Sequence, residues 1–247
     1  MKALLMAVAV AVITAVTIAA LAPATLVDAR VAAVSDGAVR LADAGGTVWR
    51  GSGFLGASDG RWRVPVAWTL DLAPLMRGEA VVALGSAEAS DVRGRASLSR
   101  DHVVIDSLDA ALPGTMLGAL DPTATLATGG EVKVRATSLN VVPGSDGGTL
   151  VADWVNARAH VGTLRIDLGT VTLRLAARSG ALAGPLANMG GDVGVDGNLT
   201  LRDQRVDAQL RLTPRAAASP ELRNALASLG AADAQGAVTL RIARTLR

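Results

Sequence analysis

Short segments in which apolar and polar residues alternate run through most of this chain. The clearest are 61–66, 79–84, 102–108, 131–135, 161–168, 170–175, 198–202 and 206–212. Because successive side chains of a strand point to opposite faces, each segment would place its apolar side chains on one face of a sheet and its charges on the other. Glycine- and aspartate-rich turns such as 143–148 and 195–198 separate such segments. The pattern predicts a mainly β protein of antiparallel meanders, in an extended, curved or sandwich-like sheet.

Signals for helices are few. The strongest begins at Ser219, which can act as the N-cap, with Pro220 at the first helical position. Leucines then recur at helical spacing, at 222, 226 and 229, until Gly230. This predicts a short helix near the C-terminus that packs on the last hairpin. Two further short helices are predicted, one after Asp71 and one over residues 112–120.

The chain opens with a long uncharged stretch, residues 3–27, preceded by Lys2 and followed by Asp28 and Arg30. About twenty residues in a helix span a hydrocarbon core roughly 30 Å thick, so the stretch predicts one membrane anchor. The positive charge at the short end keeps that end in the cytoplasm and places the rest in the periplasm. A cleaved signal peptide is the alternative, because Ala-Leu-Ala at 20–22 and Ala-Pro-Ala at 22–24 both offer small residues of the kind a signal peptidase accepts. Its apolar region, however, would exceed the usual length of about 7–15 residues.

The domain organisation predicted from these patterns has four parts. Residues 1–27 are the cytoplasmic N-terminus and transmembrane anchor, 28–120 a first periplasmic β half, 121–130 a linker and 131–247 a second β half. An internal echo, Gly-Gly-Thr-Val at 45–48 and Gly-Gly-Thr-Leu at 147–150, would make the halves related. Glycine-rich turns before strands also recur by chance, so a true repeat and a coincidence both remain open.

The composition excludes several kinds of site. The chain has no cysteine, so it can form no disulfide, cysteine metal site or lipoprotein acylation site. Its net charge is only +2, and basic residues alternate with acidic ones, which argues against nucleic-acid binding. His102 and His160 lie in different strand-like segments without neighbours at metal-ligand spacing. We therefore expect no catalytic residue, metal or cofactor, and no enzymatic activity.

A glycine motif at 51–56 matches the G-x-G-x-x-G pattern of dinucleotide-binding proteins. That pattern needs a helix to begin at the turn, so that the helix N-terminus can hold the pyrophosphate. Residues 57–60, Ala-Ser-Asp-Gly, instead break the chain before another strand. The motif therefore predicts a glycine-rich hairpin rather than a nucleotide site.

Tryptophans are rare in this chain, and two of them lie in recognisable elements. Trp49 belongs to a G-T-V-W-x-G element at 46–51, and Trp68 opens a W-x-L-x-L-x-P-L-x-x-G element at 68–78. We expect both to be core anchors whose indole N–H needs one partner, with an exposed partner-binding role as the alternative. The predicted C-terminal helix carries a third element, P-x-L-x-x-x-L-x-x-L-G at 220–230.

The order of one N-terminal anchor and these three elements resembles the type II secretion system protein N family. The resemblance implies a non-enzymatic, single-pass inner-membrane protein of a Gram-negative secretion apparatus, with most of its mass in the periplasm. Its partners would be inner-membrane and periplasmic secretion-system proteins, and it would assist assembly of the apparatus and export of folded proteins. The residues that match the family pattern are assigned first to folding: Trp49, Gly51, Trp68, Leu75, Gly78, Leu226 and Gly230.

A second function remains open at this point. A curved antiparallel sheet with one apolar face and a membrane anchor also resembles the AsmA-like periplasmic proteins, which bind or transfer lipid in an apolar β-groove. The roughly 220 residues after the anchor would form only a short groove of this kind.

Overall fold

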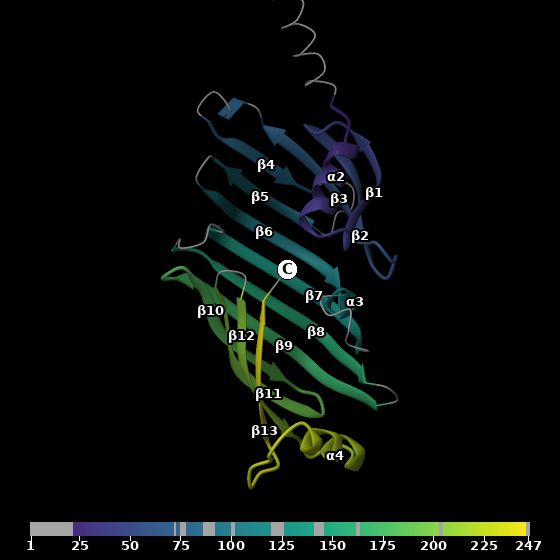
Figure 1. Ribbon diagram of the computed structural model, residues 1–247, viewed down its shortest axis with the longest axis vertical. Coiled ribbons are helices and arrows are strands. Elements are labelled where there is room, and N and C mark those ends of the chain that lie inside the picture. Colours follow the sequence, from purple (N-terminus) through teal and green to yellow (C-terminus); the bar gives the residue numbers. More distant parts are fainter. Residues whose placement is uncertain are drawn as a thin grey trace, which may run out of the picture. The chain divides into compact units, whose positions relative to one another are not determined.

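The computed structural model describes most of the chain after the first 21 residues (Figure 1). The described residues are 22–71, 73–74, 78–85, 92–99, 102–119, 126–140, 146–161, 164–202 and 205–245. The chain divides into two compact units, Met1–Ser90 and Asp91–Arg247. In both units the described residues form mainly antiparallel β-structure, so the predicted fold class is confirmed at that level.

The first unit contains one helix and four strands among its described residues. They are α2 (Thr25–Val34), β1 (Val39–Gly46), β2 (Arg50–Ala57), β3 (Arg63–Asp71) and β4 (Ala80–Leu84). The strands pair antiparallel in chain order, with Gly51 opposite Trp68 and Leu55 opposite both Leu41 and Val64. Helix α2 packs against β1, and Ala24 at its start is buried with Leu41 and Trp68.

The second unit is a longer meander. Its elements are β5 (Val92–Leu98), β6 (Val103–Pro113), α3 (Thr115–Ala119), β7 (Leu126–Asn140), β8 (Thr149–Val161), β9 (Leu164–Arg178), β10 (Ala181–Met189), β11 (Val193–Arg202), β12 (Arg205–Pro214), α4 (Pro220–Ser228) and β13 (Val238–Thr245). Each strand pairs antiparallel with the next. Because the strands of each unit follow one another in one meander, the sandwich-like alternative is wrong within either unit.

Helix α4 is the predicted C-terminal helix, and it covers one end of the second unit's apolar face. It buries Leu222 and Leu226 against Val193 and Val195 of β11, with Ala218 completing the cluster. A second cluster lies elsewhere on the sheet, around Ala136, Leu139 and Ala177. The alternation of apolar and polar residues along the strands therefore produces one apolar face, buried in these clusters and partly buried elsewhere, and one wet face.

Two sequence predictions about turns and strands are wrong in detail. The predicted turn at 195–198 lies inside β11, where Gly197 faces Leu210 of β12. A Cβ at Gly197 would come within 2.2 Å of the Gln209 carbonyl oxygen, so the glycine permits close strand approach rather than a turn. The segments 161–168 and 170–175, predicted as two strands, are not separate. Most of both lies in the single strand β9, which passes through Gly169 with φ +69°.

The two weaker helix predictions were also imprecise. Over 112–120 the helix occupies only Thr115–Ala119, because Leu112 and Pro113 still belong to β6. After Asp71, the described residues Ala73 and Pro74 form a short 3₁₀ turn, and the rest of 72–77 lies outside the described residues. The glycine motif at 51–56 forms strand β2 rather than a hairpin.

Most of the predicted anchor, residues 1–21, lies outside the described residues. Within the part of the chain that the structure describes, no helix is long and apolar enough to cross a membrane. Residues 22–27 lie in the first unit, where Val48 N–H donates to the Ala22 carbonyl at 2.9 Å. The segment 121–130, predicted as a linker, lies in the second unit, and its last five residues begin β7.

Candidate functional site

The family-pattern residues of the first unit surround the Trp68 side chain. Trp68 is 8% exposed, and its indole Nε1 donates to the Val48 carbonyl at 3.0 Å. Gly51 lies opposite it on β2, and a Cβ at Gly51 would fall 2.4 Å from the Trp68 ring. The G-T-V-W-x-G and W-x-L-x-L elements thus form one packing arrangement, in which Gly51 makes room for the ring and Val48 accepts its hydrogen bond.

The other pattern residues of this unit lie around the same strands. Trp49 is half-buried, and its carbonyl accepts from Leu70 N–H at 2.6 Å. Gly78 lies just before β4 with φ +77°, a conformation that favours glycine. Leu75 lies outside the described residues.

The C-terminal pattern residues belong to the α4 cluster. The Ser219 hydroxyl accepts from Leu222 N–H at 3.2 Å and caps the helix. Leu226 is 5% exposed within the cluster. A Cβ at Gly230 would lie 3.2 Å from the Val238 side chain, so Gly230 lets the chain pass close to β13. Ser219, Leu226 and Gly230 thus take part in the capping and packing of this helix.

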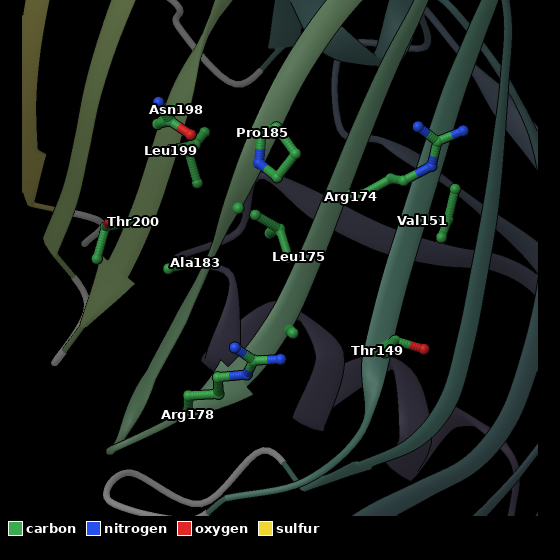
Figure 2. Close-up of a pocket in the computed structure, with 12 residues that line it drawn as sticks. Thr149, Val151, Arg174, Leu175, Arg178, Ala183, Pro185, Asn198, Leu199 and Thr200 are labelled. Carbon is green, nitrogen blue, oxygen red and sulfur yellow. The ribbon is translucent and has the colours of Figure 1, made fainter.

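The second unit also carries an open groove of about 720 Å³ on its polar face, which the sequence did not predict. Figure 2 shows its walls, which come from four neighbouring strands: Thr149 and Val151 of β8, 174–176 and Arg178 of β9, 183–185 of β10 and 198–200 of β11. Its volume lies within the range of about 300–1,000 Å³ common for ligand sites.

The groove lies beside a stretch of β9 and β10 in which two ladder pairs are missing although the register is unchanged. The register between β9 and β10 runs to the pair Ala176–Ala183 and resumes at Leu173–Leu186. Between them lie Gly184 and Pro185, and proline has no N–H to donate to the ladder. The neighbouring side chains on the floor, Ala176 and Ala183, are small. The small side chains of the floor leave the hollow, while the two strands stay close together at Gly184, where a Cβ would clash with the Arg174 carbonyl oxygen.

Two arginines of β9 line the groove with exposed side chains, Arg174 and Arg178. Asp153 on β8 accepts from the Thr172 hydroxyl at 2.7 Å and from Arg135 at 2.8 Å. The Thr172 hydroxyl, together with Arg135 and Arg174, holds the pKa of Asp153 below its ordinary value. Arg174 is thus a second cation beside a carboxylate that Arg135 already binds. The Arg178 guanidinium forms no hydrogen bond or ion pair with any described residue.

Uncharged polar groups also face this groove without partners. The side chains of Thr149, Asn198 and Thr200 line it and form no hydrogen bond within the described ranges. Register pairs place them on one face, because Ala183 lies opposite Thr200 and Pro185 opposite Asn198. The groove therefore offers two guanidinium groups, two hydroxyls and one amide above a small apolar floor.

The first unit has a smaller depression, of about 230 Å³, beside the glycine motif. Phe54 and Gly56 line it, and the Arg63 guanidinium stacks 4.1 Å from the centre of the Phe54 ring. Arg63 is also paired with Asp43, so this cation already has partners. No helix begins at the motif, and the arrangement lacks the geometry of a dinucleotide site.

The histidines and acidic residues do not gather into a metal site in the described part of the chain, where no group of three His, Asp or Glu residues is placed to hold an ion. His160 lies on β8 opposite Arg165, and His102 immediately precedes β6. What the structure brings together is packing residues in the first unit and, in the second, an open groove with a largely apolar lining and several polar side chains.

Comparison with known protein families gives a match over most of the chain. A family model described as type II secretion system (T2SS), protein N matches residues 37–241. The match runs from just before β1 into β13 and so covers strands of both units. No curated protein and no solved structure matches the chain.

Proposed function

Because this chain belongs to the type II secretion system protein N family, we propose that it is a non-enzymatic inner-membrane component that assists assembly of the secretion apparatus. The observation that carries the proposal is the family match, which spans residues 37–241. A component of this system serves the export of folded proteins, and most of the chain would act from the periplasm. The AsmA-like lipid-binding alternative receives no support from the comparisons.

The proposed membrane location rests on the uncharged residues 3–27. Their last part is tied into the first unit, since Ala24 is 1% exposed and its N–H donates to the Gly46 carbonyl at 3.2 Å. A helix that crosses the membrane before Ala22 would therefore hold the first unit within a few residues of the bilayer surface.

The proposed assembly role rests on surfaces suited to protein contact. One is the polar groove of the second unit. Another is the outer edge of β13, where residues 239–243 pair with β12 on one side and with no described strand on the other. An open strand edge can add a strand from another protein through main-chain hydrogen bonds.

A secretion assay tests this proposal. We expect a strain that lacks the chain to retain in the periplasm a folded protein normally exported by its type II system, and the full-length chain to restore export. A variant in which residues 3–21 are replaced by a cleavable signal peptide should restore export poorly, because the anchor is lost. Normal export without the chain would contradict the proposal.

A further inference from the structure

The groove on the polar face of the second unit has features of a binding site that the family match does not explain. It combines two cations, three uncharged polar side chains and a floor of small residues in one hollow of about 720 Å³. None of these five polar side chains forms a hydrogen bond with another described residue. An occupant should supply acceptors for the guanidinium groups and both donors and acceptors for the rest.

The spacing of the two cations constrains the occupant. Arg174 and Arg178 are four residues apart on β9, so both point to the same face, with Ala176 between them. At a rise of about 3.3 Å per residue, their backbone positions lie about 13 Å apart. An extended polypeptide that lies along β9 repeats the same spacing, so its residues i and i+4 would face the two arginines.

The uncharged side chains distinguish a polypeptide from a lipid tail. Hydroxyls of Thr149 and Thr200 and the amide of Asn198 can donate to carbonyl groups and accept from N–H groups. A polypeptide backbone offers both along its length, whereas an acyl chain would cover these groups without bonding them, at a cost in free energy. The small side chains of Ala176 and Ala183 leave room for such a backbone to approach the sheet.

We propose that this groove binds an extended acidic segment of a partner protein, with carboxylates four residues apart paired with Arg174 and Arg178. The inference deepens the proposed function, since it states the chemistry of one contact that an assembly component would make. Charge complementarity favours an acidic segment. At one end of the groove Asp153 is already bound by Arg135, and at the other end Arg178 has no described partner.

The test uses the full-length chain in mild detergent and a fluorescein-labelled seven-residue peptide. The peptide carries two glutamates four residues apart, with alanine and threonine elsewhere, and binding is followed by fluorescence anisotropy. Two control peptides have glutamine in place of both glutamates, or glutamates only two residues apart. We expect the first peptide to bind best, and its affinity to fall as salt is added.

Variants locate the binding. Arg174→Gln and Arg178→Gln should each weaken binding by about two- to fivefold, and the double variant by about tenfold, as expected for exposed ion pairs. Arg241→Gln is the matched control, because Arg241 lies on the same polar face but on β13, away from the groove. Ala183→Trp should abolish binding without a change of charge, because the indole would fill the floor.

Several results would overturn the inference. These are equal binding of the glutamine peptide, equal loss in Arg241→Gln and the double variant, or no binding up to about 1 mM peptide. Phosphatidylglycerol vesicles that bind through Arg174 and Arg178 when the peptide does not would assign the groove to lipid head groups instead. If the peptide does not bind, or if lipid head groups bind in its place, a chain that still restores export would leave the proposed function standing.

Discussion

Helices α2 and α4 each pack against the sheet of their own unit, yet they are held there by different forces. Helix α4 begins at a serine cap, has proline at its first position and buries Leu222 and Leu226 along one side. Helix α2 has Ala24 at its N-cap, with no side-chain cap, and its apolar residues are not gathered on one side. Local sequence places α4, whereas contacts distant in sequence place α2.

The main contact of α2 is a charged clamp to β1. Arg40 donates to both oxygens of Asp28, at 3.0 and 2.6 Å, and Leu41 N–H donates to the same carboxylate at 2.8 Å. The Arg40 bond, followed by that from Leu41, lowers the pKa of Asp28 to about 2. The Asp28 carboxylate thus joins the helix to the strand, which shows that a short helix without an N-terminal side-chain cap can be positioned by the strand that follows it.

The largest loss of stability is expected when the central side chain of the first unit's core is truncated. Trp68→Ala should destabilise this unit by about 3–5 kcal/mol, because the ring fills the space beside Gly51 and packs near the start of α2. Hydrogen exchange of residues 39–71 measures the effect. Trp68→Phe should cost less, since it mainly loses the bond to Val48. Unchanged hydrogen exchange in Trp68→Ala would show that the Trp68 side chain does not stabilise the core of this unit.

The equivalent change for α4 is Leu226→Ala, expected to cost about 2–4 kcal/mol through loss of packing against β11. Hydrogen exchange of residues 193–230 reports it. Leu229→Ala is the matched control, since Leu229 is 53% exposed and its truncation should change stability by less than about 0.5 kcal/mol. Equal effects of the two variants would mean that α4 does not pack as described.

Removing the Asp28 carboxylate should destabilise the first unit by less than these truncations do, and the loss should depend on pH. Asp28→Asn should cost about 1–2 kcal/mol at pH 7, because Arg40 and Leu41 N–H lose a charged acceptor. The folded-state pKa lies below the ordinary value of 3.8, so the wild-type contribution is complete above pH 4 and is lost as the pH falls towards 2.

Protection of the α2 amides, corrected for intrinsic exchange, should therefore fall between pH 4 and 2 in the wild type and change less in Asp28→Asn. Asp36→Asn removes an equal charge just beyond the helix and should keep the wild-type profile. The same loss of protection in Asp28→Asn and in the wild type across this pH range would argue against the clamp.

The smallest expected effect is at the cap of α4. Ser219→Ala should cost about 1 kcal/mol, because Leu222 N–H loses its acceptor. Ser219→Asp retains an acceptor and should restore most of the stability. Protection of Leu222 N–H is the direct readout. A larger loss here than in Leu226→Ala would mean that the serine cap stabilises α4 more than the buried leucines do.

The sequence predicted the features that depend on short-range pattern. Strands with charges on one side, such as β12, follow from alternation, and α4 follows from Ser219, Pro220 and its leucine spacing. It did not predict α2, since the clamp pairs residues twelve apart and the helix carries no capping signal.

The sequence did not predict the groove either, because the groove also depends on contacts between strands. Strand β10 was not among the predicted strands, and it runs through Gly184 and Pro185, two residue types that are rare within strands. The two arginines of β9 were interpreted as an ordinary wet face. Only the register of β8 to β11 shows that they lie above a hollow beside unpaired polar groups. Glycine followed by proline within an alternating segment is the signal that could have drawn attention to it.

Copurification most directly tests the claim that this chain is an assembly component of the secretion system. The tagged full-length chain would be extracted from membranes in mild detergent, and its bound proteins and lipids identified by mass spectrometry. We expect stoichiometric type II secretion-system proteins, reduced in amount when Arg174 and Arg178 are both replaced by glutamine. Phospholipid enriched above the detergent background, with no such proteins, would contradict the account.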